Sequence, residues 1–215
     1  MNRLRPIKMV SAKEKVATEL RRAILSKQLK EGEELLLENI ASQLNVSAMP
    51  VREAFQILAR DGLIKLRKNK CAVVLGVTEK YIREHYQLRA ILESAATKLA
   101  CRAPMEDIAS IEEVHKDACK VLEEKRYTEY AEFNRAFHNE IWTVAGNDKL
   151  KNMISELWNG LSIGSMVSEE EYAKVSNREH EEILEAIKNR DEKKAEAEMK
   201  LHIYRSMDDM LTYYQ

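Results

Sequence analysis

Apolar residues near the start of the chain recur at helical spacing. Val16, Leu20 and Ile24 fall four residues apart, which predicts a helix over 12–28 with one buried stripe. The same kind of pattern predicts a second helix over 37–44. A third is predicted to start after Ser47, a residue type favoured at the N-cap, and to end at Gly62.

Two short apolar runs then replace the helical pattern. They cover residues 63–66 and 72–75, and we interpret them as two strands. The segment between them, 67–71, is rich in Lys and Arg. A pair of strands with a basic tip forms a wing that can lie over DNA phosphates.

The junction between the second and third predicted helices fits a helix-turn-helix. Such a motif needs a small residue where the helices cross, a residue that tolerates positive φ at the turn, and an aliphatic residue facing back. Ala41, Asn45 and Val51 occupy these places. A winged domain can also bind another protein, but the basic tip and Arg52 favour DNA.

From residue 78 onward the periodicity is helical throughout, which predicts an all-helical bundle. The expected helices cover 79–102, 105–124, 127–145, 148–166, 176–190 and 192–213. In the first of them, one face is expected to be buried; it comprises Ile82, Tyr86, Arg89, Leu92, Ala96 and Leu99. The fold class is therefore mainly α, with domains at 1–77 and 78–215.

Charge divides the chain at the same place. Residues 1–77 hold 15 Lys and Arg against 8 Asp and Glu, whereas residues 78–215 hold 20 against 28. This asymmetry indicates that only the first part meets a polyanion. The three scattered cysteines and the absence of a long apolar run favour a cytoplasmic protein without a membrane segment.

Three histidines fall on three different predicted helices of the bundle. His138 follows Asn134 by one turn, and His180 and His202 lie on the last two helices, each beside apolar neighbours. Imidazoles that converge inside a bundle can bind a divalent metal ion. The alternative is that they are scattered and bonded locally. His115 is expected on a solvated face.

The stretch NVSAMPVREAF at 45–55, followed by DGLI at 61–64, resembles the recognition-helix signature of the GntR family of regulators. This resemblance implies DNA contacts by Ser47, Met49, Pro50, Arg52, Lys68, Asn69 and Lys70. The usual arginine after the serine is Ala48 here, the usual threonine is Met49, and the wing glycine is Cys71. Operator preference should therefore differ from that of typical relatives.

The remainder resembles the FCD domain of the FadR subfamily. The matching segments are RAILE at 89–93, NRAFHNEI at 134–141 with GNDKL at 146–150, EHEEILEAI at 179–187, and His202. The resemblance implies a divalent metal, Zn or Ni, bound by Asn134, His138, His180 and His202. It also implies a small carboxylate effector held by Arg89, with His85 lining the pocket. Asn134 is a weaker ligand than an aspartate because its oxygen is neutral.

The expected function is that of a ligand-responsive transcription regulator, a repressor, acting as a homodimer on a palindromic operator in double-stranded DNA. The residues also allow two alternatives. One is a metal sensor without an organic effector. The other is a metalloenzyme in a helical bundle, which is disfavoured because the chain has one Glu-x-x-His pair, Glu112 and His115, and no second. We expect no enzyme activity.

Overall fold

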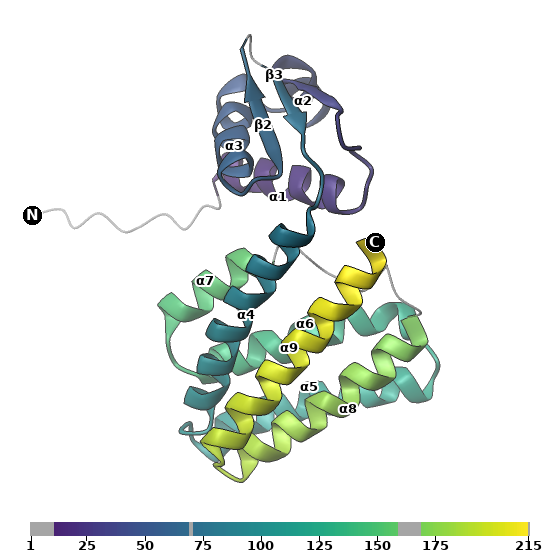
Figure 1. Cartoon of the computed structure of the whole chain (residues 1–215). Coiled ribbons are helices and arrows are strands. Elements are labelled where there is room, and N and C mark those ends of the chain that lie inside the picture. Colours follow the sequence, from purple (N-terminus) through teal and green to yellow (C-terminus); the bar gives the residue numbers. More distant parts are fainter. Residues whose placement is uncertain (1–10, 69–70, 159–168, 215) are drawn as a thin grey trace, which may run out of the picture. The chain divides into compact units, whose positions relative to one another are not determined.

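The computed structural model describes residues 11–68, 71–158 and 169–214, which form two compact units. The first unit ends at Thr78 and the second begins at Glu79 (Figure 1). Within the described residues, no helix is both long enough and apolar enough to cross a membrane.

The first unit contains three helices, α1 (Ala12–Leu25), α2 (Leu37–Gln43) and α3 (Ala48–Arg60). Helix α1 begins with a capping box, in which the Ser11 hydroxyl accepts from the Glu14 N–H and the Glu14 carboxylate accepts from the Ser11 N–H. It ends at Leu25, three residues before its predicted end, and the chain turns at Lys27, which has φ +57°. Helix α1 packs on α3 through an apolar stripe.

A three-stranded antiparallel sheet completes this unit, with strands β1 (Glu34–Leu36), β2 (Ile64–Arg67) and β3 (Cys71–Val74) in the order β1-β3-β2. The pair β2 and β3 forms the wing predicted from the sequence. The predicted first strand began at Leu63, but the Leu63 N–H bonds to the Leu58 carbonyl and still closes the end of α3. Strand β1 was not predicted, because it has only three residues and buries only Leu35.

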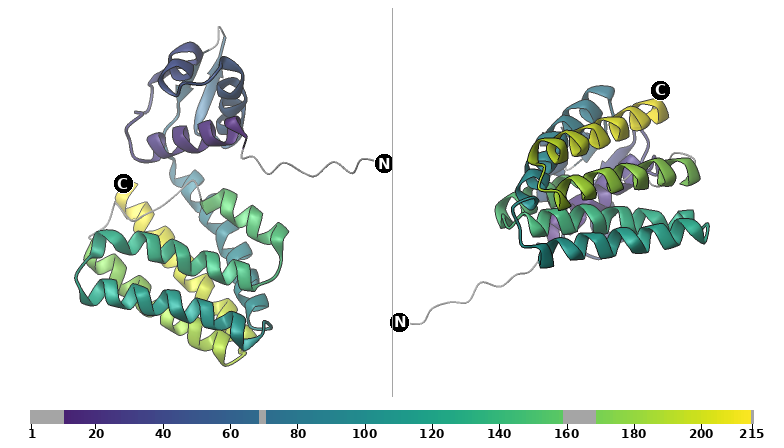
Figure 2. Two further views of the ribbon diagram at one scale, coloured as in Figure 1. Left: turned by 180° about the vertical axis from the view of Figure 1, so that it is seen from behind. Right: turned by 90° about the horizontal axis from the view of Figure 1, so that it is seen from below.

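The second unit is all helical. Its elements are α4 (Glu79–Ala100), α5 (Met105–Glu123), the short 3₁₀ helix η1 (Tyr127–Glu129), α6 (Tyr130–Val144), α7 (Asp148–Trp158), α8 (Glu169–Lys188) and α9 (Glu192–Tyr214). Packing contacts run in a closed ring from α4 to α9, α8, α5, α6 and back to α4, with α7 against α4 and α6. The long helices lie side by side around one interior (Figures 1 and 2).

Two helix starts in the second unit differ from the sequence prediction. Helix α8 begins at Glu169 rather than at 176, and the predicted helix over 127–145 opens with the 3₁₀ turn η1. The end of the predicted helix over 148–166 lies outside the described residues beyond Trp158.

Helix α4 buries a more polar face than its sequence predicted. Leu92 and Leu99 are only half-buried, whereas Glu93 and Thr97 are fully buried. The Thr97 hydroxyl donates to the Glu93 carbonyl at 2.8 Å. The buried Glu93 side chain has polar partners inside the bundle, Arg89 and His138, which belong to the site described next.

Candidate functional site

The helix-turn-helix geometry sets the recognition surface of the first unit. Asn45 has φ +51° at the turn, as predicted. Ala41 and Val51 are buried on the two helices that meet there. Val51 is fully buried, which fixes the rotation of α3 about its axis and therefore which of its side chains face solvent.

The exposed face of α3 carries most of the DNA-contact residues expected from the resemblance. Ser47 occupies the N-cap position, but its hydroxyl makes no capping hydrogen bond. Met49 and Arg52 are exposed, and Pro50 is half-buried. Gln56, one turn after Arg52, is also exposed on this face and was not predicted. The sequence could have indicated Gln56, because it lies seven residues, or two helical turns, after Met49 and therefore on the same face of α3.

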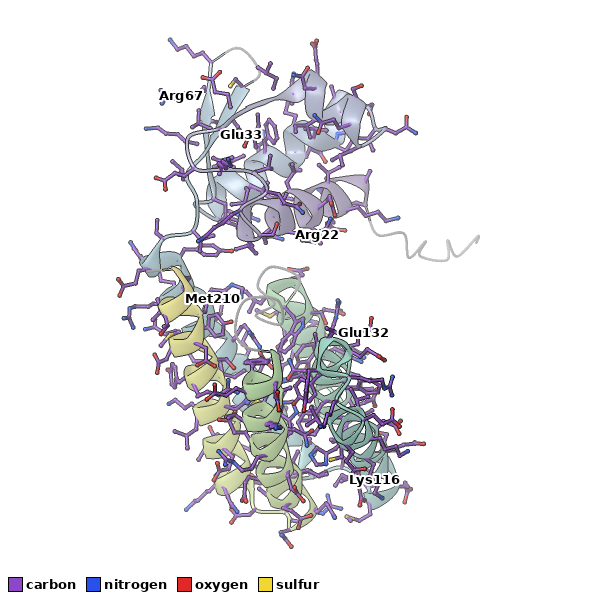
Figure 3. The ribbon with its side chains drawn as sticks, turned by 90° about the vertical axis from the view of Figure 1, so that its right-hand side faces the viewer. Arg22, Glu33, Arg67, Lys116, Glu132 and Met210 are labelled. Carbon is purple, nitrogen blue, oxygen red and sulfur yellow. The ribbon has the colours of Figure 1, made fainter. Side chains whose placement is uncertain are left out.

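The wing adds basic side chains. Lys65, Arg67 and Lys68 are exposed, and Figure 3 shows Arg67 near the end of its strand. Lys65 was not predicted as a contact, because it falls within the strand pattern, whereas Arg67 was predicted only as part of the basic tip. The predicted contacts Asn69 and Lys70 lie outside the described residues.

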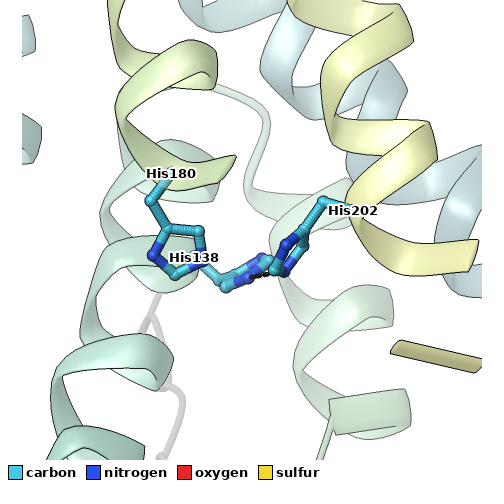
Figure 4. A group of neighbouring side chains, drawn as sticks. All are labelled: His138, His180 and His202. Carbon is cyan, nitrogen blue, oxygen red and sulfur yellow. Dashed lines mark hydrogen bonds between the residues drawn. The ribbon is translucent and has the colours of Figure 1, made fainter. Parts of the chain in front are cut away.

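Inside the second unit, three of the four predicted metal ligands come together. His138 on α6, His180 on α8 and His202 on α9 each present one ring nitrogen, and these atoms lie within 4.8 Å of one another (Figure 4). The Nε2 atoms of His138 and His202 are 3.1 Å apart. All three side chains are buried, and we refer to His138, His180 and His202 as the triad.

Each ring is oriented from behind by another side chain. His138 Nδ1 lies 2.7 Å from Glu93 Oε2, and His202 Nδ1 lies 2.7 Å from Glu179 Oε2. Tyr130 Oη lies 3.4 Å from His180 Nδ1. Histidines that bind metal ions in proteins are commonly held in this way through the nitrogen that is not a ligand.

The pKa shifts show which groups are charged. Burial would raise the pKa of Glu93, but Arg89 and His138 outweigh it and lower the value to about 2. Glu179 also has its pKa lowered to about 2, because His202 and Arg205 outweigh its burial. Burial lowers the pKa of His202 to about 4. Ionised carboxylates therefore face neutral imidazoles.

This arrangement fits a bound cation. An ionised carboxylate only accepts hydrogen bonds, so His138 and His202 carry their protons on Nδ1. Their Nε2 lone pairs then point toward each other across 3.1 Å. His180 Nε2 is buried and has no hydrogen-bond partner among the described residues. Three imidazole lone pairs in one small buried space match the donor set that Zn²⁺ and Ni²⁺ accept.

Asn134, the fourth predicted ligand, lies one turn before His138 on α6 and is buried. Its Oδ1 accepts from the Ser176 hydroxyl at 3.4 Å. Ser176 lies one turn before His180 on α8, so Asn134 is held on the same side of the bundle as the triad. It is a neutral group, and the negative charge near the triad comes from Glu93 and Glu179.

Arg89, the predicted effector-binding arginine, is buried beside the triad. Its Nε donates to Glu93 Oε1 at 2.8 Å, and its guanidinium lies over the Trp158 ring at 4.2 Å from the centroid. His85, one turn earlier on α4, stacks on Tyr81. Glu93 thus bridges Arg89 and His138 through its two oxygens.

The expectation that His115 lies on a solvated face was wrong. His115 is buried and its Nε2 bonds to the Asn177 carbonyl at 3.2 Å. The charged residues around it in sequence, such as Glu113 and Lys116, are exposed, but His115 falls on the side of α5 that packs against α8.

Around the three histidines, the sequence analysis missed three supporting residues. The Glu179 carboxylate contacts His202 and the Tyr130 hydroxyl contacts His180. Arg205 in turn donates to Glu179 at 2.6 Å. Glu179 stood beside His180 in the sequence, but adjacent helix residues point in different directions. Its contact with His202 therefore required the packing of α8 against α9.

The two units of the chain match two different families of known protein domains. Residues 12–74 match the profile of bacterial regulatory proteins of the gntR family, and residues 84–205 match that of the FCD domain. The gluconate operon transcriptional repressor of Bacillus subtilis is 34% identical over 154 residues, which cover 68% of this chain and 59% of that protein. The uncharacterized HTH-type transcriptional regulator YdhC of Bacillus subtilis is 26% identical over 188 residues, covering 86% of this chain and 84% of that protein.

Among solved structures, E. coli McbR/YncC superposes with a TM-score of 0.73 at 22% identity, covering 96% of this chain and 100% of that one. A GntR regulator from Rhodococcus sp. RHA1 superposes with a TM-score of 0.65 at 23% identity, covering 94% and 99%. At these identities the likeness shows the fold.

Proposed function

Since the chain belongs to the GntR family of bacterial transcription regulators and carries an FCD domain, we propose that it is a repressor controlled by a small carboxylate bound beside a metal ion. The observation that carries this proposal is the set of three buried imidazole nitrogens that face one another with carboxylates behind two of them. The family consists of regulators, which disfavours the metalloenzyme alternative.

His138, His180 and His202 would hold the ion through Nε2, and Asn134 Oδ1 is the candidate for a fourth ligand. A bound divalent ion would supply positive charge to attract an anionic effector. Glu93 and Glu179 keep the ring protons on Nδ1, so that the Nε2 lone pairs are available before any ion arrives. Zn²⁺ or Ni²⁺ suits this donor set.

Glu93 links the two halves of the proposed pocket. One oxygen accepts from Arg89 and the other from His138, so a carboxylate that reaches Arg89 competes with Glu93. That competition would loosen the orientation of His138. Effector and metal binding are therefore expected to be coupled, and the ring of helices that includes α4 would transmit the change.

In the first unit, α3 would enter the major groove of the operator. Ser47, Met49 and Arg52 are exposed at or near the start of this helix, where unpaired N–H groups favour phosphate. Gln56 can pair with adenine N6 and N7. Two copies of the chain, joined as a homodimer, would read a palindromic operator while the basic wings contact the backbone.

The first experiment is elemental analysis of protein purified without chelator. We expect about one metal ion per chain, lost in a His202→Ala variant and retained in a His115→Gln variant, which changes a histidine outside the triad. Absence of metal from the wild-type protein, or equal content in all three proteins, would contradict the metal centre.

A second measurement separates the effector-controlled repressor from a pure metal sensor. Operator duplexes would be selected from random DNA with the metal-loaded protein and then titrated against a panel of small carboxylates. A change in operator affinity with a carboxylate at constant metal supports the proposal. A response to metal alone, with none to any carboxylate, would instead support the metal sensor.

A further inference from the structure

A second polar cluster lies between helices α5 and α8, apart from the triad. It comprises His115 and Cys119, one turn apart on α5, and Asn177 on α8. His115 and Asn177 are 6% and 8% exposed, whereas Cys119 keeps part of its surface in solvent. None of the three has a role in the proposed regulation by metal and effector.

The His115 ring has a defined tautomer. Its Nε2 lies 3.2 Å from the Asn177 backbone oxygen, and a carbonyl only accepts, so Nε2 carries the proton. Nδ1 is therefore left with a lone pair. That nitrogen lies 3.9 Å from Cys119 Sγ, within the range of a hydrogen bond to sulfur, so it can accept the thiol proton. Cys119 is thus positioned as a nucleophile, His115 as its base, and the Asn177 carbonyl as the group that orients the base.

The Asn177 side chain completes the cluster. Its Nδ2 donates to Cys119 Sγ at 3.3 Å, which stabilises negative charge on the sulfur. Its Oδ1 is buried and has no hydrogen-bond partner among the described residues. A buried acceptor without a donor is unusual, and it indicates that a donor bound at the sulfur would complete the site.

The other cysteines provide a contrast. Cys101 is buried and its Sγ donates to the Thr97 carbonyl at 3.5 Å, and burial raises the pKa of Cys101 to about 11. Cys71 is half-buried on β3, with its Sγ 3.5 Å from the Ala72 carbonyl. Only Cys119 among the three has an imidazole nitrogen and an amide donor on its sulfur in the described part of the chain.

We propose that Cys119 is a peroxide-reactive thiol whose sulfenic acid is formed with His115 as base and held by Asn177. The thiol proton passes to His115 Nδ1, the sulfur attacks one oxygen of a hydroperoxide, and the O–O bond breaks. The proton on Nδ1 goes to the leaving oxygen, which departs as water or an alcohol. Sulfur is oxidised by two electrons and the peroxide is reduced by two. The new S–O–H can donate to Asn177 Oδ1.

The test follows sulfenic acid formation at each cysteine of the full-length, metal-loaded protein. Hydrogen peroxide is added with a 1,3-dione probe, and the labelled peptides are quantified by mass spectrometry over time. We expect Cys119 to react about tenfold faster than Cys71, and about tenfold faster than Cys119 itself in guanidinium-unfolded protein. Equal rates in folded and unfolded protein would overturn the proposal, and this comparison requires no variant.

A variant then isolates the base. His115→Gln retains a side-chain N–H that can donate to the Asn177 carbonyl but has no basic nitrogen, so the Cys119 rate should fall about tenfold. Glu106→Gln, an exposed change on the same helix, should leave the rate unaltered. Folding of both variants is verified by circular dichroism. An undiminished rate in folded His115→Gln would contradict the role of His115.

Discussion

The two units of this chain differ in what they bury. Among the described residues, every fully buried polar or charged side chain lies in the second unit, and the buried side chains of the first unit are apolar. The candidate functional groups follow the same division between surface and core. In the first unit Met49 and Arg52 lie on the surface, whereas in the second His138 and Arg89 lie in the core.

In the first unit, the residues that stabilise the fold differ from those expected to contact DNA. In the second unit, the same buried residues serve both stability and the candidate site. An apolar core is stabilised by burial alone, so the first unit can alter its exposed recognition residues at little cost. A buried charge is tolerated only when it is paired and hydrogen-bonded. The second unit therefore depends on the groups around its triad, and anything that binds them also changes the stability of the fold.

The largest expected effect comes from removing Glu93. A Glu93→Ala variant leaves Arg89 buried without its carboxylate and His138 without its acceptor, which should lower the free energy of unfolding of the second unit by about 3–5 kcal/mol. Denaturant unfolding followed by circular dichroism measures this. The control Glu113→Ala, at an exposed position on α5, should change stability by less than ~0.5 kcal/mol. A loss below ~1 kcal/mol in Glu93→Ala would show that the polar core is not the source of stability.

A smaller effect is expected at the surface of the first unit. Arg52→Ala should weaken operator binding by about 1–3 kcal/mol if Arg52 reads bases, without changing metal content or unfolding. Fluorescence anisotropy with a selected operator and with random DNA measures the loss. Equal losses on both DNAs would make Arg52 a phosphate contact. Lys30→Ala, at an exposed lysine outside α3 and the wing, should preserve specific binding.

The smallest expected effect is a pH dependence confined to the second unit, since all five histidines follow residue 78. His180 has its pKa lowered well below 6.5 by burial and by the neighbouring His202 and His138, and His202 has its pKa lowered to about 4. Both are neutral when folded and take up protons when unfolded. Their contribution to stability is therefore full above pH 6.5 and is lost as the pH falls below it, for His202 down to about pH 4.

In metal-free protein this loss should be on the order of 1 kcal/mol per histidine between pH 7.5 and 6. Denaturant unfolding at the two pH values measures it. A His180→Phe/His202→Phe double variant should show a smaller pH dependence. An unchanged pH dependence in that variant would assign the effect to other groups.

The sequence predicted the first unit almost completely. Val16, Leu20 and Ile24 gave the face of α1, and Asn45 gave the positive φ of the turn. These features are local, because a helix face or a turn depends on residues a few positions apart. Strand β1 was not predicted, because its pairing with β3 is a long-range contact that leaves almost no local pattern in the sequence.

In the second unit the sequence indicated the helices, and the resemblance to the FCD domain nominated the three histidines. The charged residues beside His115 led to its prediction on a solvated face, which was wrong, and Glu179 was left without a role. Which residue contacts which across the bundle depends on how α4, α5, α8 and α9 rotate and pack, since that packing sets the direction of every inward side chain.

By itself, then, the sequence determined the elements other than β1 and η1, their order, and the residue types able to bind DNA or metal, because periodicity and motif spacing are local properties. Tertiary structure alone decided that Glu93 joins Arg89 to His138, that Glu179 supports His202, and that Cys119 meets His115 and Asn177. The physical reason is that hydrogen bonds act only over about 3 Å, and helix packing brings distant residues within that range.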